Sequence, residues 1–363
     1  MNIPQALRST ADPLLTVAIP TFNRVEWLRD CIRYALAQTY QHFEVVVSDN
    51  GSSDGTSEFL ASISDRRLRI IRQKSNIGLL PNWNACLTEA RGDYIIFVSD
   101  DDRIAPDFLD RSIALIRDAR DVNVALGLCD TFVAAKGACS MNSGGKLYPA
   151  RANRRYGTGI WDGGEILLEF LKRRIPTQMC TILMRTEALR ARDGFRTDLP
   201  YAADLAAWAP LLLTGRSVFI NQSCGTFIRH PGTQTSKLTL DAQLKDHGAA
   251  VRLIATAADQ SIQNPAMRKK IKSQARRNIA NVTIDKLVGS RVEGKPTSVV
   301  QPLVRKYYRD ITPGDLYEQV KLAWFILLPL PIATALHNLM FRFRVALGII
   351  PGLKIVYNKL VRD

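Results

Sequence analysis

Three consecutive aspartates, Asp100, Asp101 and Asp102, follow an apolar run that begins at Tyr94. Carboxylates held this closely repel one another, so the cluster is costly unless a cation or several hydrogen-bond donors lie among them. A divalent metal is a suitable cation, because hard cations prefer oxygen ligands. An acidic run after a strand can also be a solvated turn. The cluster alone therefore leaves a metal site and a surface turn as alternatives.

Two other apolar runs also lead into polar residues. The run 14–20 leads into Thr21 and Phe22, and the run 43–48 leads into Asp49. In an open α/β sheet the carboxyl ends of neighbouring strands line one crevice, so these residues are expected to meet at one ligand. Asp49 could accept hydrogen bonds from that ligand, or it could form only a local Asx turn. A metal together with a phosphate-bearing ligand would suit the crevice.

The elements that must position these residues alternate between strands and helices. The pattern predicts βαβ units in a mostly parallel sheet flanked by helices. Asn23 is the expected N-cap of a helix that follows the first strand, and Gly92 is the expected C-cap of a helix over 82–91. The predicted strands are 14–20, 43–48, 68–72, 94–99 and 122–128.

The second half of the chain is organised differently. The glycine-rich residues 134–164 are predicted to form a flexible connection or a lid over the crevice. Beyond them we expect helix 165–174, strand 180–185, helix 204–214 and strand 217–220. The predicted division is a catalytic domain over 1–236, with halves 14–128 and 165–236, and a mainly helical C-terminal region over 237–363.

Composition indicates a globular protein of 363 residues, of which 46% are hydrophobic. Six scattered cysteines without a CxxC pair predict reduced core residues. The first residues contain no apolar stretch long enough for a signal peptide, so a cytoplasmic location is expected. The net charge of +15 belongs mostly to the tail, since residues 241–363 hold 20 Lys and Arg against 9 Asp and Glu.

Basic clusters over 268–344 lie next to an apolar segment over 322–341. Such a combination predicts peripheral contact with the anionic inner face of a membrane. The alternative is a helical domain that packs on the catalytic half and exposes a basic face. A spanning helix is disfavoured because Pro329 and Pro331 interrupt the apolar segment.

Several short motifs occur in a fixed order between residues 17 and 102. Together they resemble family 2 glycosyltransferases of the GT-A fold. The resemblance rests on VAIPTFNR at 17–24, VVVSDNGSSDGT at 45–56, NIG at 76–78 and GDYIIFVSDDD at 92–102.

The resemblance implies a nucleotide-diphosphate sugar as the donor. Asp49 would accept a hydrogen bond from the base and Asp100 would face the ribose. The residues implied to line the base and ribose pocket are Pro20, Thr21 and Phe22.

The resemblance also implies a divalent metal, Mn²⁺ or Mg²⁺, on Asp101. Such a metal would neutralise the charge that develops on the departing nucleoside diphosphate. Asp102 and His230 are further metal candidates, although His230 could equally belong to a surface loop. Ser99 stands where many family members carry the first acid of a D-x-D set, so the assignment among the three aspartates stays open.

Asp204 matches the family position that deprotonates the acceptor hydroxyl. The family often has a second acid just before it, where this chain has Ala203. Asp204 could instead serve only as a favourable charge at a helix N-terminus, and Asp198 is the fallback candidate for the base. The implied activity is inverting transfer of a sugar to a glycan or lipid-linked acceptor in bacterial surface-polysaccharide assembly, such as that of O-antigen in the cell envelope.

Three rival functions remain. A nucleotidyltransferase would need a glycine-rich loop after the first strand, and residues 20–24 contain no glycine. A nucleic-acid-binding protein is disfavoured because no helix-turn-helix, zinc or aromatic-basic motif occurs. The third rival is a non-catalytic protein that binds sugar nucleotides or carbohydrates and has lost the general base of the family.

Overall fold

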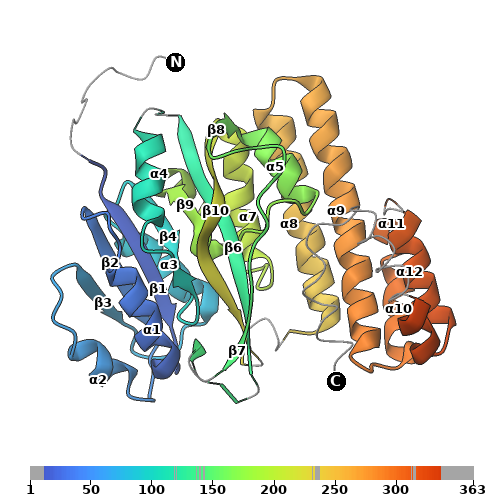
Figure 1. Ribbon diagram of the computed structural model, residues 1–363, viewed down its shortest axis with the longest axis horizontal. Coiled ribbons are helices and arrows are strands. Elements are labelled where there is room, and N and C mark those ends of the chain that lie inside the picture. Colours follow the sequence, from blue (N-terminus) through green and yellow to red (C-terminus); the bar gives the residue numbers. More distant parts are fainter. Residues whose placement is uncertain are drawn as a thin grey trace.

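The computed structural model describes residues 12–336 except 118, 120, 136, 139, 142, 143, 231, 234–237, 312, 314 and 315. The described strands form one ten-stranded sheet with helices on its faces (Figure 1). Its main strand order is β3-β2-β1-β4-β9-β6-β10-β5, with β7 paired to β6 and β8 paired to β10. This is the α/β arrangement that the sequence predicted.

The first four strands are parallel, as predicted. They are β1 (Leu15–Thr21), β2 (Phe43–Asp49), β3 (Leu68–Arg72) and β4 (Tyr94–Phe97). Every side chain of β1 and β2 is buried, because helices cover both faces of the sheet. Val17 and Ile19 pack on the face that holds α1 (Val25–Leu36), whereas Ala18 packs on the face that holds α3 (Leu79–Glu89).

The second half adds longer strands than the sequence indicated. β6 (Val122–Ala134) and β10 (Arg216–Arg229) run parallel to each other well past the ends predicted for them. Shifts in register near Ser223 allow β10 to continue beyond Ile220. β9 (Ile182–Arg185) lies antiparallel between β4 and β6. The prediction from the sequence therefore missed many residues of the second half of the sheet.

The segment 134–164, predicted as a connection or lid, contributes two strands. β7 (Gly145–Tyr148) pairs antiparallel with the end of β6, and β8 (Gly159–Asp162) pairs antiparallel with the start of β10. A two-residue strand, β5 (Arg103–Ile104), completes the sheet beside β10. Strands of two to four residues are too short to show hydrophobic periodicity, which is why they were not predicted.

Two predicted helix caps are wrong. Asn23 has φ 51° and does not cap α1, whose N-cap residue is Arg24. The carboxylate of Asp54 accepts the Val25 N–H at 2.9 Å instead, so the helix start is stabilised from the loop after β2. Gly92 does not end α3. A Cβ there would lie 2.6 Å from the backbone nitrogen of Thr16, so glycine is required for close packing against β1.

The helix predicted over 204–214 is divided. α7 (Ala203–Trp208) is α-helical, and a 3₁₀ segment, η3 (Ala209–Thr214), follows it. Pro210 lies at the start of the 3₁₀ segment and lacks the N–H that an α-helix would use there. The other short helical elements are α2 (Thr56–Ala61), α4 (Phe108–Ile116), α5 (Gly163–Leu171), η2 (Met179–Thr181) and α6 (Thr186–Arg190).

The described part of the C-terminal region is helical, as predicted. Two long helices, α8 (Leu240–Ser261) and α9 (Pro265–Val292), lead into α10 (Thr297–Lys306), α11 (Tyr308–Ile311) and α12 (Leu316–Leu327). Ala250 and Ile254 of α8 belong to the same buried cluster as the sheet, whereas α9 and α12 form a smaller core around Leu287 and Phe325. The long helices thus share a core with the sheet.

The predicted apolar segment 322–341 lies only partly among the described residues, since 337–341 fall outside them. Within the described part of the chain, no helix has both the length and the apolar character needed to cross a membrane. Five of the six cysteines are described, and all five are buried free thiols, as predicted; Cys139 lies outside the described residues.

Candidate active site

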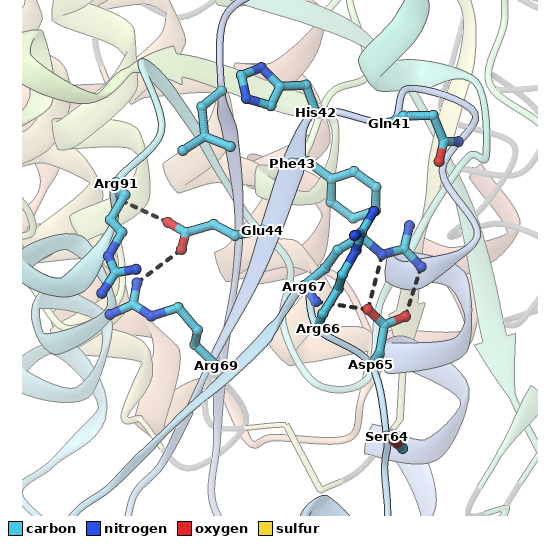
Figure 2. A pocket seen from close by; sticks show the side chains of 11 residues that line it. Gln41, His42, Phe43, Glu44, Ser64, Asp65, Arg66, Arg67, Arg69 and Arg91 are labelled. Carbon is cyan, nitrogen blue, oxygen red and sulfur yellow. Dashed lines mark hydrogen bonds and ion pairs between the residues drawn. The ribbon is translucent and has the colours of Figure 1, made fainter.

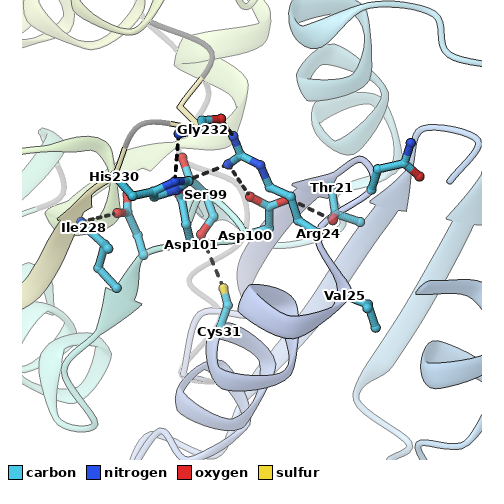
Figure 3. A network of polar contacts seen from close by, with 12 residues as sticks. Thr21, Arg24, Val25, Cys31, Ser99, Asp100, Asp101, Ile228, His230 and Gly232 are labelled. Atoms are coloured by element: carbon cyan, nitrogen blue, oxygen red, sulfur yellow. Dashed lines mark hydrogen bonds and ion pairs between the residues drawn. The ribbon is translucent and has the colours of Figure 1, made fainter. Parts of the chain in front are cut away.

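The three aspartates lie in a tight turn just beyond β4, at the carboxyl edge of the sheet. Figure 3 shows two of them, Asp100 and Asp101. The Asp102 N–H donates to the Ser99 carbonyl at 2.9 Å, which closes the turn. All three aspartates are buried, with exposed fractions between 3% and 7%. The solvated-turn alternative therefore does not describe this cluster.

Arg24 supplies the positive charge among these carboxylates. Its Nη1 donates to Asp100 Oδ1 at 3.1 Å and to Asp101 Oδ2 at 2.8 Å, and its Nη2 donates to the Gly232 carbonyl. Burial lowers the pKa of the guanidinium, but the two carboxylates outweigh that effect and raise the pKa overall. The N-cap residue of α1, a cation, thus joins the loops after β4 and β10.

Asp100 is connected to the end of β1. The Thr21 hydroxyl donates to Asp100 Oδ2 at 2.8 Å. Burial, and then the charge of Asp101, raise the pKa of Asp100 to about 6, although Arg24 and Thr21 partly offset them. Two of the residues predicted to contact the donor are therefore in direct contact with each other.

His230 and Asp101 are also in contact, as Figure 3 shows. The imidazole Nε2 lies 2.9 Å from Asp101 Oδ2. The Gly232 N–H donates to Nδ1 at 3.2 Å, so in this arrangement Nε2 carries the proton and donates it toward the carboxylate. The ring stacks on Trp27 with centroids 4.8 Å apart. A buried, oriented imidazole of this kind differs from a histidine in a surface loop.

Asp102 has a different environment from its neighbours. Its Oδ1 accepts the Ile228 N–H of β10 at 2.9 Å. Burial and the charge of Asp101 raise the pKa of its carboxyl well above the ordinary value. Asp102 therefore joins the acidic turn to β10 instead of converging with Asp101 and His230. Among the described residues, no group of three His, Cys, Asp or Glu side chains is placed to hold a metal ion.

The chemistry of the donor set nevertheless fits a divalent cation. A carboxylate oxygen and an imidazole nitrogen are ordinary ligands of Mn²⁺, and a bound diphosphate would offer further oxygens. Asp101 Oδ2 accepts a hydrogen bond from Arg24 Nη1 and lies 2.9 Å from His230 Nε2. A positive charge and a ring nitrogen are therefore already in contact with the same carboxylate oxygen. For a metal to bind there, Arg24 would have to release that oxygen and Nε2 would have to lose its proton.

Asp49 is held within its own loop. Its Oδ1 accepts the Ser52 N–H at 3.0 Å and its Oδ2 accepts the Ser57 hydroxyl at 2.9 Å. The local turn that was the alternative for Asp49 therefore exists. Its lone pairs are not exhausted by two hydrogen bonds, because a carboxylate can accept about four. Pro20 and Thr21 are buried and Phe22 is half-buried at the adjacent strand end.

Asp204 lies in the first turn of α7 and is half-buried. Its Oδ1 accepts the Leu205 N–H at 2.7 Å, and burial raises the pKa of its carboxyl. Tyr201 is its neighbour, and burial together with the charge of Asp204 raises the pKa of that phenol to about 12. Asp198, the fallback candidate, is exposed and pairs with Arg196 at 2.6 Å.

Sequence reasoning missed four residues of this region, Arg24, Trp27, Tyr201 and Lys286. Arg24 and Trp27 follow the first predicted strand closely, so their position after its carboxyl end was a usable signal. Lys286 of α9 places its Nζ 4.4 Å from the centre of the Tyr201 ring. Nothing in the sequence relates residues so far apart.

A separate cavity of about 700 Å³ lies at the opposite edge of the sheet, where β1, β2 and β3 begin (Figure 2). Its acids are already paired, since Glu44 accepts Arg69 at 2.9 Å and Asp65 accepts Arg67 at 2.8 Å. Glu44 also accepts the Arg91 N–H at 2.7 Å. The acids of this cavity are therefore engaged in contacts that stabilise the sheet edge. The acidic cluster beyond β4 is the better candidate for catalysis.

Comparisons with known proteins agree with this geometry. Residues 16–156 match the family described as glycosyl transferase family 2. Chondroitin synthase of Pasteurella multocida is 26% identical over 243 residues, which are 66% of this chain and 23% of that protein. An uncharacterized glycosyltransferase of Rickettsia typhi is 26% identical over 246 residues, 67% of this chain and 71% of the relative.

A solved structure extends the likeness beyond the family segment. S. aureus TarS 1–349 in complex with UDP-GlcNAc matches with a TM-score of 0.58 and 18% identity, over 85% of this chain and 91% of that one. At this identity the likeness shows the fold, a GT-A-like α/β sheet with a helical C-terminal region, as the sequence predicted.

Proposed function

We propose that this chain, whose residues 16–156 match glycosyl transferase family 2, is a glycosyltransferase that transfers a sugar with inversion from a nucleotide-diphosphate donor to an acceptor hydroxyl. The observation that carries the proposal is the convergence of Thr21, Arg24, Asp100, Asp101 and His230 at one edge of the sheet. Such a polar edge is where nucleotides bind in open α/β sheets.

The donor would lie along the ends of β1, β2 and β4. Pro20, Thr21 and Phe22 would line the base and ribose, Asp49 would accept from the base and Asp100 would face the ribose. Thr21 supports this placement because its hydroxyl already holds Asp100 at 2.8 Å. Arg24 would then lie next to the diphosphate and orient it through its remaining N–H groups.

Asp101 and His230 would hold a divalent metal, Mn²⁺ or Mg²⁺. When bound, the metal would neutralise negative charge on the departing diphosphate. Asp102 was predicted as a third ligand, but its bond to the Ile228 N–H favours a positioning role for this residue. Trp27 would keep the imidazole of His230 facing Asp101 by stacking on it.

Asp204 would act as the general base. Single displacement inverts the anomeric centre and requires a base on the face opposite the leaving group. The raised pKa of Asp204 suits proton abstraction, since a base works best when its pKa approaches the working pH. Asp198 is a weaker candidate because it is exposed and already paired with Arg196.

The setting that we propose is bacterial polysaccharide assembly on a glycan or lipid-linked acceptor. Residues 1–236 would form the catalytic domain, and the basic residues over 268–344 would contact an anionic membrane surface from the cytoplasmic side. No nucleic-acid partner is proposed. These points rest on the charge distribution and on the resemblance in sequence.

A donor screen tests the proposal. Purified protein is incubated with Mn²⁺, Mg²⁺ or chelator and a panel of nucleotide-sugars, and release of nucleoside diphosphate is measured. Asp101→Asn and Asp204→Asn should each lose activity, the latter by about 10²–10⁴-fold. The matched control is Asp198→Asn, which should remain active because Asp198 is exposed. Failure of every donor to bind would contradict the proposal, and binding without release would indicate a non-catalytic protein.

A further inference from the structure

One cation is fixed inside the acidic cluster beyond β4. Arg24 Nη1 donates to Asp100 Oδ1 at 3.1 Å and to Asp101 Oδ2 at 2.8 Å, and its Nη2 donates to the Gly232 carbonyl (Figure 3). The three acceptors come from two loops, one after β4 and one after β10. The arginine side chain is only 17% exposed. A long side chain with many rotamers is thus held in one position by three acceptors.

In this arrangement Asp101 Oδ2 has no place left for a metal. It accepts the bond from Arg24 and lies 2.9 Å from His230 Nε2. One carboxylate oxygen offers about two lone-pair positions, and two N–H groups fill both. The two neighbours differ in their chemistry. Imidazole is a common metal ligand, so His230 could stay in place, whereas a guanidinium stays protonated and has no lone pair to offer. Arg24 is therefore the group that has to leave.

The second oxygen of Asp101 does not avoid this conflict. A dication on Oδ1 would still lie close to the guanidinium, because both oxygens belong to one carboxylate. Like charges repel strongly at short distance where water is excluded, and Asp100 and Asp101 are only 5% and 7% exposed. Arg24 in this position and a divalent metal on Asp101 are therefore mutually exclusive, whichever oxygen the metal uses.

We propose that Arg24 is a resident cation that competes with the divalent metal for Asp101, and that the site excludes metal until a nucleoside diphosphate draws Arg24 away. The proposal rests on the function proposed above, and it adds how metal binding is regulated. Guanidinium pairs readily with phosphate oxygens, so the diphosphate offers Arg24 an alternative to the two carboxylates. Arg24 lies between β1 and α1, at the edge along which the donor would bind. Metal and donor would then bind cooperatively.

The test is the binding of Mn²⁺ alone to the full chain, followed by the loss of the electron paramagnetic resonance signal of free Mn²⁺. Without nucleotide the unsubstituted chain should bind Mn²⁺ weakly, and Arg24→Met should bind it about tenfold or more tightly, which is a usual coupling between linked ligands. Arg24→Lys should gain less than Arg24→Met, because lysine keeps the charge. Adding Asp101→Asn to Arg24→Met should abolish the gain, since the metal would lose its carboxylate.

The matched control is Arg103→Met. Arg103 directly follows the three aspartates but pairs with Asp30 at 2.7 Å, and its side chain is 12% exposed. Its loss removes the same charge from the same neighbourhood without freeing Asp101, so the Mn²⁺ affinity should stay close to that of the unsubstituted chain. An equal gain in Arg103→Met and Arg24→Met, or no gain in Arg24→Met, would overturn the proposal.

Thermal melts provide a second readout, because Arg24→Met is expected to be less stable. Mn²⁺ should raise the melting temperature of Arg24→Met and leave that of the unsubstituted chain unchanged, since a ligand stabilises only a state that it binds. Equal shifts in the two chains would contradict the competition.

The last measurement adds the nucleoside diphosphate identified by the donor screen. It should raise the Mn²⁺ affinity of the unsubstituted chain by a larger factor than that of Arg24→Met, and an equal factor would contradict the transfer of Arg24 to the diphosphate. If no nucleoside diphosphate binds, the proposed function fails, whereas the comparison of Mn²⁺ affinities still decides whether Arg24 excludes the metal.

Discussion

Substituting Arg24 offers the sharpest test of how the acidic cluster is held together. The guanidinium reaches Asp100 and Asp101 at 3.1 and 2.8 Å, and its side chain is only 17% exposed. Arg24→Met keeps much of the aliphatic stem and removes the charge. The change would leave the buried carboxylates of Asp100 and Asp101 without this cation.

The expected loss of stability is large. Removing one partner of a buried ion pair costs about 3–5 kcal/mol, because the other charge stays buried and unpaired. For a chain of this length such a loss should lower the melting temperature by roughly 4–7 °C. Lys in place of Arg24 should give an intermediate loss, since an ammonium retains the charge but cannot bridge two carboxylates as a planar fork does.

The loss should depend on pH in a defined direction. The pKa of Asp100 is about 6 in the folded chain, above the ordinary carboxyl value. The folded state therefore binds more protons than the unfolded state between about pH 4 and pH 6, and stability falls as pH rises through that window. Without Arg24 the pKa should rise further, so the deficit should be largest near pH 8 and smaller near pH 5.

Thermal melts of the unsubstituted chain and of Arg24→Met in chelator, at pH 5, 6, 7 and 8, would measure this pH-dependent loss of stability. Arg33→Met is the matched control, because Arg33 lies on the same helix and pairs with Asp30 while 62% exposed. An exposed pair contributes at most about 1 kcal/mol. Equal melting temperatures for Arg24→Met and Arg33→Met at pH 8 would refute the role assigned to Arg24.

Two further changes test the packing and the C-terminal helices. Gly92→Ala should destabilise the fold by about 1–3 kcal/mol, because the added Cβ would lie 2.6 Å from the Thr16 nitrogen. Gly289→Ala in α9 should stabilise the fold by about 0.5–1 kcal/mol, because the added Cβ would have no neighbour within 4 Å and alanine favours the helix. Equal unfolding midpoints for the two variants would contradict this prediction. In Asp285, burial raises the pKa, but Arg173 and Lys321 outweigh it and lower the pKa to about 2. Because that pKa lies below the unfolded value, the resulting stability, about 2 kcal/mol, is present above about pH 4 and lost as pH falls toward 2. Asp285→Asn should therefore melt lower at pH 7 and lack the acid-dependent loss, and an unchanged melt at pH 7 would rule this out.

The sequence alone determined the parallel half of the fold. The central residues of β1, β2 and β4 are mostly apolar, because helices cover both faces of the sheet, and β1 and β2 end in the polar residues Thr21 and Asp49. Strand ends that share one edge bring their residues together whatever the details of the loops. The proximity of Thr21 and Asp100 could therefore be expected from the strand pattern.

Only the tertiary structure decided which groups meet in the second half. β10 continues past Ile220 through shifts in register, and this extension delivers Ile228 to Asp102 and His230 to Asp101. Local periodicity does not encode such a shift. The cap from Asp54 on α1 likewise depends on two loops meeting in space.

The contribution of the C-terminal region was hidden from the sequence for the same reason. Its basic residues indicated a charged surface, but only the packing of α8 on α7 and η3, and of α9 on α8, places Lys286 over Tyr201. Residue type and spacing determine which segments form strands and helices and which chemical groups lie at the ends of those segments. Which distant side chains share a site depends on how the completed elements pack, because that is set by long-range contacts.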